Sequence, residues 1–72
     1  MTINNAKESV TYKVVNVTSD EKISKFLKTL GLFDGQEVTV ISKAGKNYVL
    51  NIKDSRYAID NYLASKINIV NI

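Results

Sequence analysis

The first stretch with a clear pattern of apolar and polar positions is Val10–Val17, which alternates in the manner of a β-strand. It is rich in β-branched residues, which favour strands. Apolar residues occupy every second position up to Val14, and the phase then slips by one residue to Val15 and Val17. Because such a slip turns side chains to the opposite face, the pattern predicts a β-bulge or a sharp bend here.

A helix is predicted for about residues 19–30, with Thr18 and Glu21 at the spacing of a capping box. One face is apolar and recurs at helical spacing, and the other carries three lysines. The apolar face consists of Ile23, Phe26, Leu27 and Leu30, and the lysines are Lys22, Lys25 and Lys28. Gly31 stands where a helix ends in a left-handed residue, and Leu32 stands where a Schellman motif packs an apolar side chain against the last turn. We therefore expect the apolar face and Leu32 to enter the core.

The rest of the chain predicts short strands joined by tight turns. Val38 and Val40 alternate in one strand, a loop at Gly45 follows, and the return strand repeats the alternation at its own apolar positions, Tyr48, Leu50 and Ile52. Residues 57–59 are short and apolar, residues 60–66 suit one helical turn capped by Asp60 or Asn61, and residues 67–72 form a last strand. The predicted fold is mainly β with one inserted helix, in the order β-α-β-β-β-short helix-β. A small five-stranded SH3-like barrel is the expected architecture, because closure removes exposed edges.

Length and composition limit the chemistry of this chain. Its 72 residues suffice for a single domain, in which we expect the polar segment 1–9 to be less ordered. Cysteine and histidine are both absent, which argues against disulfides, against a zinc or iron site, and against nucleophilic catalysis at Ser55, which has no histidine base. We therefore expect no cofactor, no metal and no enzymatic activity. A chain without cysteine suits the reducing cytoplasm, and no leader or membrane-spanning run is visible.

The order of elements and one short motif carry a family resemblance. The motif is Leu27-x-x-Leu30-Gly31-Leu32-x-x-Gly35-x-x-Val38, and a hairpin and the segment Ser55–Ile59 follow it. This combination resembles the FeoA family over most of the chain. The resemblance implies an SH3-like domain with an inserted helix and the role of a cytoplasmic accessory protein in bacterial ferrous iron uptake. It also implies a partner, the cytoplasmic GTP-binding or transmembrane part of the FeoB permease.

Two residues are candidates for contacting that partner. Phe33 follows the helix stop in a turn, where a large ring has no obvious core position, so it is either an exposed anchor or partly buried. Arg56 is the only arginine, and its planar guanidinium suits an acidic or phosphate group. The alternative for Arg56 is local, either an ion pair with Asp54 or Asp60 or stacking on Tyr57.

Two further interpretations remain open at this stage. The net charge of +3 permits a nucleic-acid-binding barrel that uses the aromatic and basic side chains of its strands and turns. The residues for such a surface are Tyr12, Tyr48, Tyr57, Lys43, Lys46 and Lys53. Separately, residues 67–72 form a terminal strand whose unpaired edge could pair across a homodimer.

Overall fold

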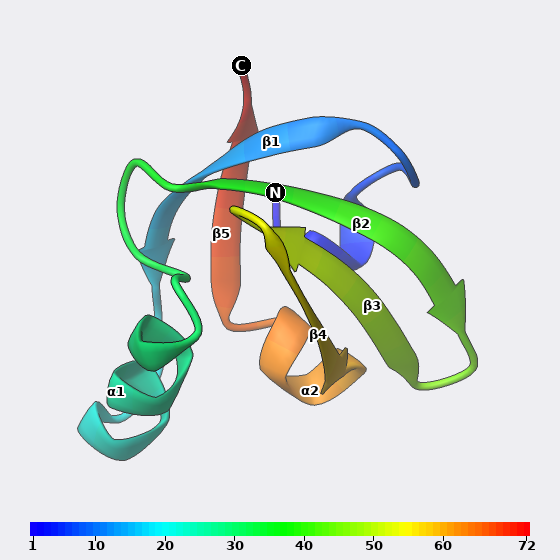
Figure 1. Ribbon diagram of the computed structural model, residues 1–72. Helices are drawn as coiled ribbons and strands as arrows, with labels where there is room; N and C mark the ends of the chain where they lie inside the picture. The colour runs from blue at the N-terminus through cyan, green and yellow to red at the C-terminus, as the bar shows by residue number, and fades with distance from the viewer.

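The computed structural model describes all residues from 1 to 72. Its five strands, two α-helices and one 3₁₀ turn follow the predicted order (Figure 1). The elements are η1 (Ile3–Asn5), β1 (Thr11–Val17), α1 (Glu21–Thr29), β2 (Glu37–Ala44), β3 (Asn47–Ile52), β4 (Ser55–Asp60), α2 (Asn61–Ala64) and β5 (Ile67–Asn71). No helix is long and apolar enough to cross a membrane.

The five strands form one antiparallel sheet in the order β4-β3-β2-β1-β5. The register of β1 against β5 shifts between Val14 and Asn16, which confirms the bulge predicted from the slip in phase. A second shift lies between Val40 and Ser42 of β2. These two irregularities let the sheet curl around the core, with α2 between the ends of β4 and β5 and α1 beside the end of β1 (Figure 1).

Helix α1 begins two residues later than predicted, because Asp20 rather than Thr18 is its N-cap. The Ile23 N–H donates to Asp20 Oδ1 over 2.9 Å. The backbone N–H of Thr18 instead donates to the Lys66 carbonyl over 2.8 Å, which holds Thr18 against the chain leading into β5. The predicted capping box between Thr18 and Glu21 is therefore wrong.

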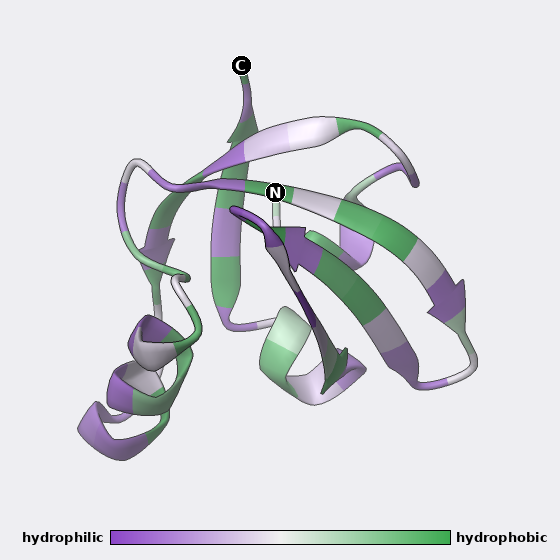
Figure 2. Ribbon diagram, viewed as in Figure 1, coloured by the Kyte–Doolittle hydropathy of each residue, from purple (hydrophilic) through white to green (hydrophobic).

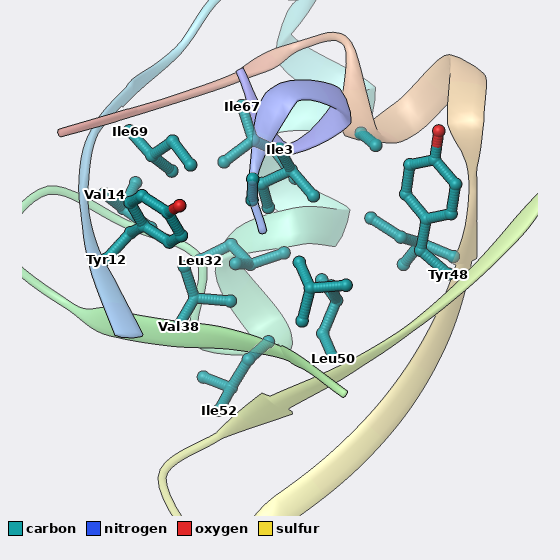
Figure 3. Close-up of a cluster of buried hydrophobic side chains, with 14 of the residues drawn as sticks. Ile3, Tyr12, Val14, Leu32, Val38, Tyr48, Leu50, Ile52, Ile67 and Ile69 are labelled. Carbon is teal, nitrogen blue, oxygen red and sulfur yellow. The ribbon is translucent and has the colours of Figure 1, made fainter. Parts of the chain in front are cut away.

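The end of α1 confirms the Schellman motif. The Gly31 N–H donates to the Lys28 carbonyl over 3.0 Å, and the Leu32 N–H donates to the Leu27 carbonyl over 3.0 Å. Gly31 has a φ of 100°, a conformation that glycine adopts without the steric cost of a β-carbon. The reversal folds Leu32 back into the core, where it is buried (Figure 3).

The core lies inside the curled sheet. Along the strands, side chains alternate between the two faces of the sheet, and those on the inner face form the core. Apolar colour follows the middle of β2 and β3 in Figure 2, and the side chains converge in Figure 3. Its members are Ile3, Ala6, Tyr12, Val14, Leu27, Leu32, Val38, Val40, Tyr48, Leu50, Ile52, Ile59, Ala64, Ile67 and Ile69. Of the predicted apolar helix face, Leu27 is fully buried and Ile23 and Leu30 are partly buried, but Phe26 is 51% exposed. Phe26 was wrongly placed in the core, because only one narrow stripe of this nine-residue helix meets the sheet.

The N-terminal segment is ordered, contrary to the expectation for residues 1–9. Ile3 is fully buried and Ala6 is nearly so, because the 3₁₀ turn η1 brings both side chains to the core. The Ile69 N–H donates to the Met1 carbonyl over 2.8 Å, and Thr2 bridges to Asn68. These contacts also cover the part of the β5 edge at Asn68 and Ile69, in the strand whose edge we considered for a homodimer.

Candidate functional site

A groove between α1 and β1 is the one surface hollow with apolar lining. It encloses about 300 Å³. The lining residues are Val15, Asn16, Val17, Ser24, Lys28, Leu32, Phe33 and Asp34. Part of this lining comes from the bulge in β1, where Val15 is the extra residue with no partner in β5 and is 38% exposed.

Phe33 lies at the mouth of this groove and is 36% exposed. Its loop is held at both sides, since the Gln36 N–H donates to the Phe33 carbonyl over 3.0 Å and the Gly35 N–H donates to the Val14 carbonyl over 2.8 Å. Because the backbone under this partly exposed ring is already fixed, binding of a partner would cost little conformational entropy of the loop. Both readings given to Phe33 from the sequence therefore apply in part, because the ring is partly buried and still accessible.

Two lysines border the apolar part of the groove. Lys28 comes from the last turn of α1 and lines the hollow. Lys53 comes from the turn between β3 and β4, and its Nζ lies 5.7 Å from the centroid of the Phe33 ring. The groove thus combines apolar side chains with Lys28 and Asp34 in its lining, and Lys53 lies beside Phe33. An apolar area bordered by polar groups is the arrangement of many protein interfaces.

Arg56 lies outside this groove. It is the second residue of β4, is exposed, and stands opposite Asn51 of β3 on the outer face of the sheet. The ion pairs considered with Asp54 and Asp60 do not form, since the single salt bridge of the chain joins Lys25 to Glu21 over 3.2 Å. No cation–π contact to Tyr57 forms either, because the three such contacts involve lysines and other rings. The structure therefore does not bring Arg56 and Phe33 into one hollow.

A second hollow of about 420 Å³ lies on the outer face of β1, β2 and β3 and is entirely polar. It is lined by Thr11, Gly35, Gln36, Glu37, Thr39, Asn51 and Lys53. The hydroxyls of Thr11 and Thr39 bond to each other over 2.8 Å, and the only ionisable lining groups are Glu37 and Lys53. Nowhere in the chain do three or more His, Cys, Asp or Glu side chains gather in a cluster that could hold a metal ion.

The surface considered for nucleic acid loses half of its residues to contacts within the chain. Tyr12 and Tyr48 are 4% and 9% exposed, so their rings serve the core and cannot stack on bases. The Nζ of Lys43 donates to the Asn4 carbonyl over 2.9 Å and lies over the Tyr48 ring. Tyr12, Tyr48 and Lys43 are thus occupied by structural contacts, and the interpretation is wrong at these three residues. Lys46 and Lys53 are exposed and Tyr57 is partly exposed.

Two groove residues, Val15 and Lys28, and the neighbouring Lys53 were missed as functional candidates by reasoning from sequence. For Val15 the slip of phase predicted a bulge at this point of the strand, but not that the side chain is exposed. Lys28 was named only as one of three lysines on the polar face of the helix, although its turn lies beside the groove. Lys53 had no local signal, because its approach to Phe33 joins residues 20 positions apart in the sequence.

Comparisons with known proteins agree on both fold and family. A family model described as FeoA domain matches residues 1–71. No curated protein matches the sequence. Among solved structures, the iron(II) transport protein A of Clostridium thermocellum superimposes with a TM-score of 0.93 at 16% identity, covering 100% of this chain and 46% of that one. This chain therefore spans less than half the length of that relative.

For two further solved structures, this chain covers a larger share of the relative. The FeoA protein of Chlorobium tepidum has a TM-score of 0.91 at 19% identity, covering 100% of this chain and 70% of that one. The FeoA of Stenotrophomonas maltophilia is complexed with zinc and is described as a unique prokaryotic SH3 domain protein. It has a TM-score of 0.87 at 21% identity, and the match covers 97% of this chain and 89% of that one. The predicted SH3-like fold is thereby confirmed. With the family model matching nearly the whole chain, this protein belongs to the FeoA family.

Proposed function

We propose that this protein binds the FeoB-type ferrous iron permease on its cytoplasmic side and modulates iron uptake. Membership of the FeoA family supports association with the ferrous iron transport system. The observation that carries the proposal for this chain is the groove between α1 and β1, with the Phe33 ring at its mouth. The partner in this proposal is the GTP-binding or transmembrane part of the permease.

The groove suits a partner segment that carries an apolar side chain with acidic neighbours. Val15 and Phe33 offer accessible apolar area, which gains free energy when a partner removes it from water. Lys28 in the lining and Lys53 beside Phe33 outnumber the one lining carboxylate, Asp34, and attract acidic groups of a partner. Aromatic anchors in partly enclosed sites often dominate the affinity of an interface, and Phe33 has that position here.

Arg56 is proposed as a second contact point. Its guanidinium is exposed and engages no carboxylate of its own chain, so a partner's acidic or phosphate group would meet an available donor. It belongs to the same β3–β4 hairpin as Lys53, which reaches Phe33. A permease surface that covers Phe33 and this hairpin would therefore include both residues.

Binding affinities of folded variants test this proposal. We expect Phe33→Ala and Arg56→Ala each to weaken binding to the whole permease, or to its isolated cytoplasmic domain, by more than about 1 kcal/mol. Phe26→Ala is the matched control, because Phe26 is a second exposed ring that lies outside the groove. Lys25→Ala is the control for charge, since Lys25 is exposed and paired only with Glu21.

The outcomes separate the groove from the rest of the surface. If all four variants bind both targets with the affinity of the wild type, Phe33 and Arg56 do not belong to the site. A loss with Phe26→Ala alone would move the contact to the outer face of α1. Circular dichroism of each variant checks that the fold is intact before affinities are compared.

A further inference from the structure

The sheet has one edge whose backbone groups are left unpaired, and it belongs to β4. In the strand order, β4 is terminal and pairs only with β3. The other terminal strand, β5, has its outer edge bonded to Met1 and bridged to Thr2. An uncovered strand edge is a template for pairing with another chain.

The phase of the β3–β4 ladder shows which residues face this edge. The Asn61 N–H donates to the Lys46 carbonyl over 2.7 Å, which makes Lys46 and Asn61 a hydrogen-bonded pair in line with the register of Asn47 opposite Asp60. Hydrogen-bonded pairs alternate along an antiparallel ladder. The N–H and C=O groups of Arg56 and Ala58 therefore point away from β3, toward the open edge.

Along this edge, Arg56 and Asp60 carry opposite charges and lie equally far along the strand from Ala58, one on each side of it. Arg56, Ala58 and Asp60 are all exposed and share the outer face of β4. Arg56 has no ion-pair partner within the chain. Asp60 uses Oδ1 to cap α2 through the Leu63 N–H at 2.8 Å, which leaves its second carboxylate oxygen for another donor.

We propose that β4 pairs with β4 of a second copy of this chain, antiparallel about a two-fold axis at Ala58. In this register the Ala58 backbone groups bond to each other across the axis, and each Arg56 stands opposite Asp60 of the second copy. Opposite charges directly across an antiparallel pair are stabilising, and like charges are destabilising. Isologous pairing of this kind needs a self-complementary surface, and this edge provides one.

Charge also selects this register over its neighbour. A shift by two residues that places Arg56 opposite Ala58 would bring Asp60 opposite Asp54 of the second copy, two like charges. The strand has six residues, so the interface is small and the dimer is weak and concentration-dependent. The proposal does not rest on the permease. Neither Phe33 nor the groove takes part, and although Arg56 is also the second proposed permease contact, the pairing is tested on the chain alone.

Sedimentation equilibrium and amide hydrogen exchange over a range of protein concentrations test the pairing. We expect a monomer–dimer equilibrium in which the Arg56 and Ala58 amides gain protection as concentration rises. The Tyr57 and Ile59 amides, which bond to β3, should be protected at every concentration. A chain that stays monomeric up to millimolar concentration, or protection that appears on another strand, would overturn the proposal.

Variants separate strand pairing from a general effect of charge. Arg56→Glu places two carboxylates opposite each other and should weaken dimerisation by about tenfold or more. Lys22→Glu, the same change of charge on exposed α1, is the control and should leave the equilibrium unchanged. Ala58→Pro removes an N–H that the monomer does not use, so the fold should persist while the dimer is lost. Dimerisation that survives both Arg56→Glu and Ala58→Pro contradicts the proposed edge.

Discussion

Gly31 and Ile52 lie so close together that a β-carbon on Gly31 would come within 2.9 Å of Ile52 Cγ2. Gly31 ends α1, and Ile52 is a buried residue at the end of β3. The helix end is thus pressed against the sheet at a position where no side chain fits. This contact fixes the loop that carries Phe33, because the loop starts directly after Gly31.

Gly31→Ala should therefore be strongly destabilising. Its φ of 100° strains any residue with a β-carbon, and the Ile52 contact adds a steric clash in the core. Gly35→Ala is the matched control, since Gly35 has a φ of 89° but nothing within 4 Å of the added carbon. We expect Gly35→Ala to cost about 1 to 2 kcal/mol, and Gly31→Ala to cost about 1 to 3 kcal/mol more because of the clash.

Urea unfolding of both variants measures this difference. The midpoints should fall in the order wild type, Gly35→Ala, Gly31→Ala, with similar slopes. Equal midpoints for the two variants would show that the helix end yields to the added carbon and is not held against Ile52.

Leu27 should contribute more to stability than Leu30. Leu27 is fully buried, whereas Leu30 is only partly buried at the helix end. Leu27→Ala should cost about 2 to 5 kcal/mol, because it removes buried methyl groups and leaves a cavity. For a chain of 72 residues, with a total stability of about 4 to 11 kcal/mol, that is a large fraction. Thermal and urea unfolding of the two alanine variants compare them directly, and a larger loss with Leu30→Ala would contradict the burial.

Local signals in the sequence predicted local structure well. The Schellman end at Gly31 and Leu32 depends on residues within one turn of each other, and both of its hydrogen bonds form. The bulge after Val14 also follows from the alternation of a single strand. Phe26 was misplaced because periodicity defines an apolar stripe but not how much of it the sheet covers, which depends on the docking angle of the helix.

Long-range contacts account for what the sequence did not reveal. Ile3 sits in a polar segment and enters the core only because η1 folds against β5 and α2. At the candidate site, the turn around Phe33 predicted a ring that is either exposed or partly buried, and the ring is 36% exposed. The approach of Lys53 to Phe33, and the separation of Arg56 from the groove, arise from strand pairing across β2, β3 and β4. No local pattern carries that information.

Ile3 should be an essential core residue despite its place near the N-terminus. Ile3→Ala removes a fully buried side chain and should cost about 2 to 5 kcal/mol. Asn5→Ala is a useful comparison, because Asn5 lies in the same 3₁₀ turn, is exposed and bonds only to Thr2 by its side chain. We expect a drop of less than about 1 kcal/mol for Asn5→Ala. Similar melting temperatures for wild type and Ile3→Ala would restore the view of a loosely attached segment.

Stability should not depend on divalent metal ions. The chain lacks the cysteine and histidine that zinc prefers, and its carboxylates form no cluster of three. The S. maltophilia FeoA is described in complex with zinc, so the same ions are the sharpest probe here. A ligand that binds the native state raises stability by mass action, by about 2.7 kcal/mol at one hundred times its dissociation constant. Melting curves recorded with zinc or with ferrous iron under anaerobic conditions should therefore overlay those recorded with a chelator. A saturable rise in melting temperature, reversed by the chelator, would instead reveal a site built from carboxylates and carbonyls, and Glu37 in the polar hollow would be the first residue to replace.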